Sequence, residues 1–349
     1  KLGRMGGSNL RAAFTDSFEL EGANWDKNML AEFKRRRGYS LEPYLPYLIF
    51  KVGEMGNPVK EKYGSEFSPE VQEEVINRVR NDFDLTQREL FHEAFTIPYN
   101  KWCHRNGMLS RVQAYGRGLH TLESSMYIDI PECETWFGHH HGTSFPDNSM
   151  AGRGYTMVNK FVSSAAHLAG NPNVSCEEIT NTGWVFNATL EKLKLTGDLS
   201  NLSGVNHSIF HGFNYSPKEA PFPGWLRYGT YFSERNPWWP YLRHWMDYKA
   251  RLSAVLQNSE QQADVAILPP VEDMWSKFGS QRDPFPQLTY PTYANTMWEV
   301  VHQNGHGCDY ISEKILTEGR SRNGELRYGP RAYKTILLMD VESIRPEAA

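Results

Sequence analysis

The 349-residue sequence lacks several features that would place it in a common class of protein. No apolar run approaches the roughly 20 residues that a membrane-spanning helix needs. There is no basic excess, since 37 Lys and Arg stand against 41 Asp and Glu, so we expect no nucleic acid partner. No Gly-rich nucleotide fingerprint, repeat or low-complexity tract is present. These absences argue against membrane-spanning, nucleic-acid-binding and assembly proteins.

Cysteine is scarce as well. The four cysteines, Cys103, Cys133, Cys176 and Cys308, are spread too widely for a small disulfide scaffold. No pair among them has the spacing of metal ligands. We therefore expect free, buried thiols.

Aromatic residues, in contrast, are plentiful, with 10 Trp, 18 Tyr and 18 Phe. Packing in the core accounts for most of them. A surplus in loops would suit stacking against the flat apolar faces of sugar rings.

Strand-like and helix-like segments alternate over the first 213 residues. We expect strands at residues 12–15, 108–114, 126–130, 173–179 and 205–213. We expect helices at residues 25–37, from 69 to about 98, 158–169 and 188–199, with Gly38 capping the first. This alternation predicts a parallel sheet with crossover helices. Five strands cannot close an eight-stranded barrel, so we predict a (β/α)8 TIM-type barrel that is incomplete at its N-terminus, in a fragment or processed chain.

A second unit is expected after a Trp-rich helix at residues 238–257. Apolar strands at residues 263–268 and 335–338 flank a helix at 293–304. They predict the start of a small doubly wound, Rossmann-like α/β domain. The expected division is a partial barrel at residues 1–258 and an accessory domain at 259–349.

Acidic residues follow three of the predicted barrel strands. They are Asp16 and Glu19, Glu132 and Glu134, and Glu177 and Glu178. The C-terminal ends of barrel strands meet at one active-site mouth. Acids converging there are what a glycosidase with two catalytic carboxylates needs. The alternative is that each acid caps a helix or pairs with an arginine.

Two histidines lie on the last of these strands. His207 and His211 are four residues apart, so both side chains should face the same way, with Asn214 just beyond. They could hydrogen-bond a polyhydroxylated ligand. A histidine satisfied within the core is an equally good interpretation.

Several motifs, in order, resemble one family. They are FTDSFE (residues 14–19), DIPECETW (129–136), SSAAHLAGNPNVSCEEIT (163–180), GVNHSIFHGFNYSP (204–217) and YGTYFSERNPWW (228–239). Together they are similar to the bacterial α-L-rhamnosidases of glycoside hydrolase family 106, over most of residues 12–270. The resemblance implies a (β/α)8 catalytic barrel, an inverting mechanism, a calcium ion near the sugar, and a secreted or periplasmic location.

The resemblance also assigns residues. The family's P-x-x-E-x-W glutamate falls on Glu134, its A-E-x-x-T glutamate on Glu177, and its D-S-x-E acid on Glu19. This chain departs from the pattern by the extra acids Glu132 and Glu178. Its cysteines at 133 and 176 stand where small residues are more common, and these departures leave the substrate open.

Our leading hypothesis is a glycosidase that cleaves terminal α-L-rhamnosyl linkages in oligosaccharides or polysaccharides. Glu134 and Glu177 would be its general acid and base, in an order that the sequence leaves open, with carboxyls roughly 6.5–9.5 Å apart. Glu178 should face away from the cleft, so that Glu178→Gln leaves turnover nearly intact.

The remaining candidates would surround this pair. Asp16 and Glu19 would orient sugar hydroxyls, with Glu19 a candidate calcium ligand. The other expected sugar contacts are Trp136, His207, His211 and Asn214. Two alternatives stay open: a non-catalytic carbohydrate-binding barrel, and a related glycosidase acting on another deoxy-sugar or a uronic acid.

Overall fold

The computed structural model describes residues 9–18, 25–48, 68–116, 119–137, 157–181, 186–213, 215–224, 228–278 and 296–349. Two of the candidate site residues, Glu19 and Asn214, lie outside these ranges. Within them, no helix combines the length and the apolar character that crossing a membrane would require.

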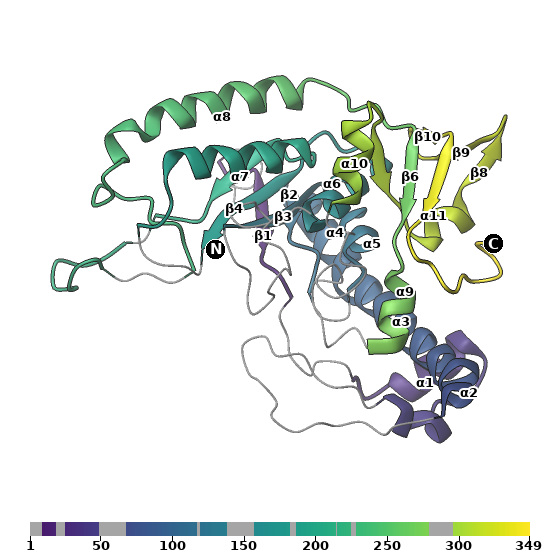
Figure 1. The fold of residues 1–349 in the computed structure, drawn as a ribbon. Helices are drawn as coiled ribbons and strands as arrows, with labels where there is room; N and C mark the ends of the chain where they lie inside the picture. The colour runs from purple at the N-terminus through teal and green to yellow at the C-terminus, as the bar shows by residue number, and fades with distance from the viewer. Residues whose placement is uncertain are drawn as a thin grey trace.

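A five-stranded parallel sheet forms the centre of the molecule (Figure 1). Its strands are β1 (Ala12–Thr15), β2 (Leu109–Val112), β3 (Ile130–Phe137), β4 (Ser175–Asn181) and β5 (His207–Phe210). Their spatial order follows the chain, and the sheet curls into half a barrel. Within the described residues β1 pairs only with β2 and β5 only with β4, so both edges are open. The prediction of about five parallel strands is confirmed, and the curled sheet is consistent with an incomplete TIM-type barrel.

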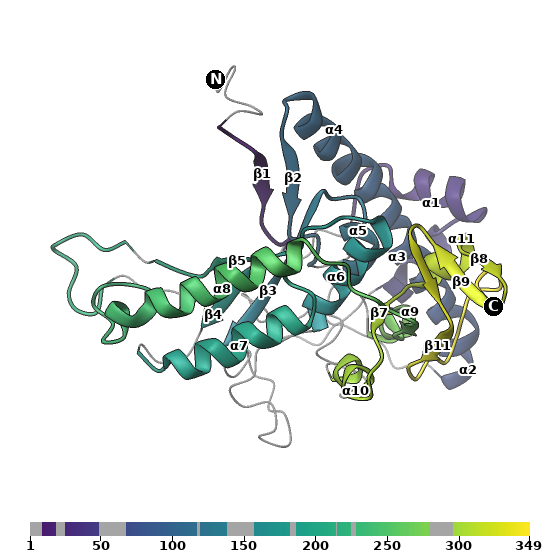
Figure 2. The same cartoon turned by 90° about the horizontal axis from the view of Figure 1, so that it is seen from above.

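Helices cover the outer face of this sheet, as crossover connections between parallel strands require. They are α6 (Met157–Ala169), α7 (Leu190–Leu202) and α8 (Leu242–Gln257), the last preceded by a short turn, η6 (Trp239–Tyr241). Helices α7 and α8 run side by side in both views (Figures 1 and 2). The concave face of the sheet is left for side chains of the strands themselves.

The third strand differs from the sequence prediction. Residues 126–130, expected as a strand, instead follow the short helix α5 (Thr121–Ser125), and β3 begins at Ile130. Glu132 and Glu134 are therefore inside the strand and not beyond its end. The sequence concealed this because charged residues are not expected inside a buried strand. Glu132 is fully buried there, paired with Arg111 and hydrogen-bonded by Ser175.

A long helical segment packs beside the sheet. It consists of α2 (Pro69–Val71), α3 (Asn77–Phe91) and α4 (Ile97–Arg105), joined by the π-helical turns η3 (Gln72–Ile76) and η4 (His92–Thr96). Pro98 does not end the helix as expected, because the wider π turn before it leaves room for the proline ring. The predicted cap is confirmed: Gly38, at φ +84°, closes α1 (Met29–Arg37), which the turn η2 (Glu42–Leu48) follows.

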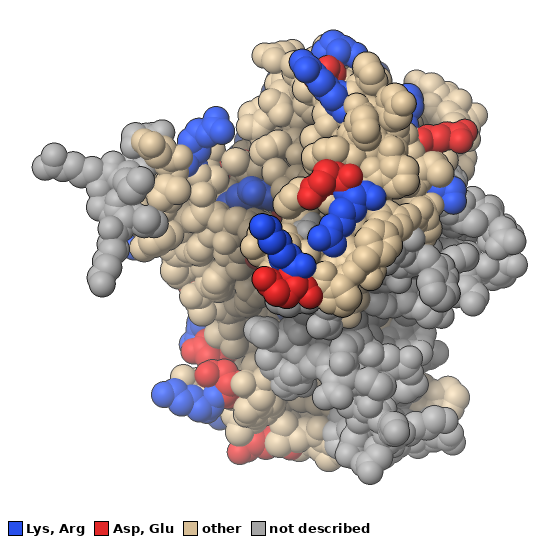
Figure 3. Space-filling view, turned by 90° about the vertical axis from the view of Figure 1, so that its left-hand side faces the viewer, with Lys and Arg blue, Asp and Glu red and all other residues tan. Residues whose placement is uncertain are grey.

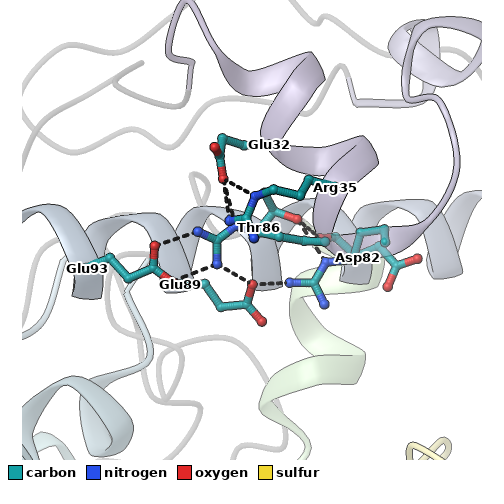
Figure 4. A network of polar contacts seen from close by, with 8 residues as sticks. Glu32, Arg35, Asp82, Thr86, Glu89 and Glu93 are labelled. Carbon is teal, nitrogen blue, oxygen red and sulfur yellow. Dashed lines mark hydrogen bonds and ion pairs between the residues drawn. The ribbon is translucent and has the colours of Figure 1, made fainter.

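A charge network fastens α1 to the long helical segment (Figure 4). Arg36, whose side chain is 8 % exposed, contacts Glu32 on its own helix and reaches Glu89 at 3.0 Å and Glu93 at 2.6 Å. Neighbouring Arg37 also pairs with Glu89. Several carboxylates thus share two guanidinium groups, which makes this a network and not isolated surface pairs.

The C-terminal part contains a second parallel sheet in the order β11-β6-β7. Its strands are β6 (Val265–Leu268), β7 (Cys308–Tyr310) and β11 (Thr335–Leu338), with helices α9 (Val271–Phe278), α10 (Met297–Gln303) and α11 (Glu313–Glu318). An antiparallel sheet of β8 (Arg320–Arg322), β9 (Glu325–Tyr328) and β10 (Arg331–Tyr333) was not expected.

The two parts of the chain share one hydrophobic core. Phe161 of α6 packs against Tyr310 of β7, with ring centroids 5.0 Å apart, and both belong to a cluster that extends from Cys133 and Trp136 of β3 to Tyr333 of β10 and Met339. The predicted separate accessory domain is therefore not confirmed. The four cysteines are free and buried, as predicted.

The charged side chains on one face of the molecule are mixed in sign. In Figure 3 many of the Lys and Arg side chains lie close to Asp and Glu side chains, and the others are scattered singly. No broad basic surface forms on the described part of that face.

Candidate active site

The concave face of the half barrel carries the candidate catalytic carboxylates. Glu134 of β3 stands opposite Glu177 of β4 in the strand register, and Glu132 stands opposite Ser175 one row deeper. Because side chains alternate along a strand, these four residues point to the same side. Glu134 is buried and Glu177 is partly exposed, so the pair lies where the sheet meets solvent.

A histidine and a threonine complete this cluster. Nδ1 of His211, just past β5, lies 2.8 Å from Oε1 of Glu177 and 3.0 Å from the hydroxyl of Thr180. That hydroxyl donates to Oε1 of Glu134 at 2.6 Å. The hydroxyl proton is thereby committed, so Nδ1 of His211 is assigned as the protonated ring nitrogen that donates to Glu177.

A bulge in β4 brings Thr180 into the site. Glu178 pairs with Thr135 while Thr180 pairs with Trp136, so Ile179 is the extra residue between them. Ile179 has a φ of +70°, which is rare for a β-branched residue. With Ile179 taken out of the alternation, the Thr180 hydroxyl falls on the same side as Glu134.

A buried amide supports Glu177 from the other side. Nε2 of Gln113 donates to Oε2 of Glu177 at 2.7 Å, and the Tyr115 hydroxyl donates to Oε1 of Gln113 at 2.6 Å. Sequence reasoning missed Gln113, Tyr115 and Thr180. A signal did exist, because Gln113 is a polar residue between Val112 and Ala114 in the strand predicted at residues 108–114.

This environment favours the ionised form of Glu177. Burial on its own would raise the pKa of Glu177, but hydrogen bonds from His211 and Gln113 outweigh it and hold that pKa below its ordinary value. Burial raises the pKa of Tyr115 well above its ordinary range, and the nearby Glu134 and Glu177 add to this effect. Glu177 is thus a carboxylate at neutral pH, and Tyr115 is a neutral hydroxyl.

Glu178 points to the opposite face of β4, as predicted. It is fully buried, and Nζ of Lys249 on α8 lies 3.1 Å from its Oε1. The same ammonium group donates to Oδ1 of Asn201 at 2.7 Å. Glu178 therefore belongs to a buried ion pair between the sheet and the helix layer. Glu178→Gln, expected to leave turnover nearly intact, would disturb this ion pair and with it the stability of the fold.

The other predicted site residues are more scattered. Trp136 is only 8 % exposed and packs in the main core cluster, which leaves a sugar little of its surface to stack on. His207 stands opposite Ser175, in the deeper row, and burial followed by the nearby Arg111 lowers its pKa. Asp16 is exposed just after β1 and accepts a hydrogen bond from the Ser17 amide.

The nearest oxygens of the two glutamates are closer than the spacing we expected between the carboxyl groups. One oxygen of Glu134, one oxygen of Glu177 and one nitrogen of His211 all lie within 4.8 Å of one another. We expected roughly 6.5–9.5 Å between the carboxyls of an acid–base pair in an inverting enzyme. The pair is closer because the two residues are direct register partners on strands that run about 4.8 Å apart.

The donor set of this cluster does not fit calcium. Calcium takes six to eight oxygen ligands, whereas this cluster offers two carboxylates and an imidazole whose Nδ1 already bonds Glu177. These residues therefore do not form a calcium site. The calcium implied by the resemblance rests on Glu19, which lies outside the described residues.

These features define a glycosidase-type half barrel, with carboxylates inside the curl of a parallel sheet. The chain belongs to glycoside hydrolase family 106, described as alpha-L-rhamnosidase, whose family profile matches residues 1–348.

Individual relatives are similar to this chain to different extents. The chain is similar to a rhamnosidase structure from Novosphingobium sp. PP1Y, with a TM-score of 0.66 and 25 % identity over 97 % of this chain and 29 % of that one. It is 29 % identical over 350 residues to a "putative beta-glucuronidase" of Formosa agariphila, covering 99 % of this chain and 26 % of that protein. A β-galactosidase from the psychrophilic Marinomonas ef1 shares the fold, with a TM-score of 0.52 at 12 % identity over 93 % of this chain and 50 % of that one. The chain thus spans between a quarter and a third of the length of the first two relatives.

Proposed function

We propose that the protein hydrolyses terminal α-L-rhamnosyl linkages in oligosaccharides or polysaccharides. The observation that carries the proposal is the Glu177 carboxylate, ionised and oriented by two donors on the concave face of the half barrel. Membership of the family supports the choice of sugar.

Glu177 is the general base in this proposal. Its pKa lies below the ordinary value, so it holds no proton at neutral pH and accepts one from the attacking water. Glu134, tied to Thr180 and within 4.8 Å of Glu177, stands on the same side of the sugar. An inverting reaction then takes its proton donor from a carboxyl group outside this pair, across the scissile bond.

The charge of the site favours a neutral sugar over a uronic acid. Glu132, Glu134 and Glu177 lie in two adjacent rows of the concave face. Arg111, which could otherwise bind a sugar carboxylate, is already paired with Glu132. A uronate would therefore meet uncompensated negative charge, although the similarity to a putative beta-glucuronidase makes a glucuronide the necessary comparison.

The test is a kinetic comparison of wild type and Glu177→Gln in the intact protein. Aryl α-L-rhamnosides with good and poor leaving groups, and an aryl β-glucuronide, are the substrates, with and without a chelator. Loss of a base should lower kcat by about 10²–10⁴-fold for every leaving group, because the base acts on water. A loss confined to poor leaving groups would make Glu177 the acid. Binding of rhamnose without turnover of any substrate would support the non-catalytic alternative.

A further inference from the structure

Two side chains behind Glu177 form a buried pair that contacts solvent nowhere. Gln113 and Tyr115 follow β2 (Leu109–Val112), and each is 0 % exposed. Arg111, Gln113 and Tyr115 are every second residue, so all three lie on the concave side of the sheet, where the carboxylates are.

The hydrogen bonds around Gln113 fix the orientation of its amide. The Tyr115 hydroxyl donates to Oε1, and Nε2 donates to Glu177 at 2.7 Å and to Glu132 at 3.3 Å. A flipped amide would turn its oxygen towards both carboxylates, which accept hydrogen bonds but cannot donate them when ionised. Only the observed orientation satisfies all three neighbours: the two carboxylates require the amide nitrogen on their side, and the Tyr115 hydroxyl holds the amide oxygen by donating to it.

We infer that Tyr115 and Gln113 are positioning residues for the reaction, holding one oxygen of Glu177 so that the other faces His211 on the concave side of the sheet. The inference rests on the proposed function, in which Glu177 is the base. Neither residue touches the sugar or the attacking water. Each acts through Glu177, Gln113 by donating to it and Tyr115 by orienting that donor.

Charged groups on every side of Glu177 make this donor important. Glu134 and Glu132 of β3 are like charges, and they oppose the ionisation of Glu177. His211 beside β5 and Arg111 on β2 favour it, but the Arg111 guanidinium is paired with Glu132. Without the Gln113 amide, Glu177 would keep His211 as its hydrogen-bonding partner among the described side chains and would be protonated more readily.

The experiment is the pH profile of kcat in the intact protein, measured from about pH 4 to about pH 9 on an activated aryl α-L-rhamnoside. Gln113→Met removes the donor at similar volume. In this variant, kcat at the acid end of the pH profile should fall about tenfold relative to the plateau that the same variant reaches at higher pH. Tyr115→Phe keeps the ring and should cause a smaller loss in the same direction. KM should stay within about twofold for both, because neither side chain meets the sugar.

A matched control separates this role from a general loss of stability. Tyr333→Phe also removes a buried tyrosine hydroxyl, which donates to Asp309 at 2.9 Å and is far from Glu177 in the fold. It should leave the acid side of the profile where it is in wild type. An unchanged acid side in both Gln113→Met and Tyr115→Phe would overturn the inference, as would an equal displacement in Tyr333→Phe.

A second readout keeps this inference separate from the proposed function. The infrared band of the protonated Glu177 carboxyl, identified by its absence in Glu177→Gln, reports ionisation without turnover. In Gln113→Met it should persist to higher pH than in wild type, and an identical titration would overturn the inference. Full activity of Glu177→Gln would overturn the proposed function alone, since the infrared titration still decides the role of Gln113.

Discussion

Glu134 and Glu177 are register partners on neighbouring parallel strands, with one oxygen of each within 4.8 Å of the other. Thr180 and His211 connect them through hydrogen bonds. Two carboxylates that share partners in this way can both reach the same bound sugar. The outcome of the reaction therefore depends on whether they serve one catalytic role or two.

The configuration of the released sugar distinguishes these cases. If the pair serves as one base, water attacks opposite the leaving group, and the first product from an α-L-rhamnoside is the β-anomer. Proton NMR of the anomeric signal, recorded before mutarotation, measures it. Release of the α-anomer would instead make Glu134 and Glu177 a nucleophile and acid pair, for which a separation near 5 Å is usual.

Glu178→Gln should destabilise the fold while leaving the cleft intact. It leaves the Lys249 ammonium, 3 % exposed, without its counter-charge. Removing one partner of such a pair costs about 3 kcal/mol in free energy of unfolding, measured by urea denaturation. The double variant Glu178→Gln/Lys249→Met removes both charges and should recover part of that loss. A double variant less stable than Glu178→Gln would contradict this account of the pair.

The stability of the protein should fall as the pH drops from about 6.5 to about 4. Burial, followed by repulsion from Lys160, lowers the pKa of His302 to about 4, and its Nε2 has no hydrogen-bond partner among the described residues. The unfolded chain, in which histidine titrates near 6.5, takes up this proton first, so acid favours unfolding across that window.

His302→Gln should flatten the dependence of the melting temperature on pH between those values. The exposed His244 on α8 provides the control, since His244→Gln should leave the slope as it is in wild type. Equal slopes in wild type and His302→Gln would show that another group is responsible.

Arg36→Met should loosen α1 from the long helical segment. Arg36 contacts three carboxylates with its side chain almost covered, so its loss should cost about 1 kcal/mol, and less at high salt. Arg35→Met is the control, because the Arg35 side chain is 61 % exposed and its ion pair is with Glu32. Equal losses in the two variants, measured by urea denaturation, would argue against a special role for the Arg36 network.

The periodicity of the sequence predicted the half barrel well where one face of an element is distinct. The strand at residues 12–15 and the helix that ends at Gly38 were confirmed because turn and cap residues mark their ends. The predicted strand at 126–130 was wrong because the real one, β3, is buried on both faces and carries acids inside it. In strands that are buried on both faces, the sequence shows no alternation of apolar and polar residues.

The candidate site was predicted in part, for a similar reason. Glu134 and Glu177 were found through motifs, and the structure brings them together with His211. Gln113 and Thr180 were missed because their roles depend on contacts between strands that are distant in the sequence. The close spacing of the two glutamates could not be read either, since it follows from the register of β3 against β4.

The bulge at Ile179 divides two tasks along four consecutive residues of β4. Glu177 and Thr180 belong to the concave face, while Glu178 is paired with α8 and Ile179 packs in a core cluster with Leu193 and Trp245. In a regular strand the side chains of residues 178 and 179 would point to opposite faces, so one of them would lie on the concave face. The extra residue lets the helix layer keep an ion pair and an apolar anchor side by side. The side chain of Ile179 therefore serves the packing of the helix layer, while its backbone sets the position of Thr180 on the concave face.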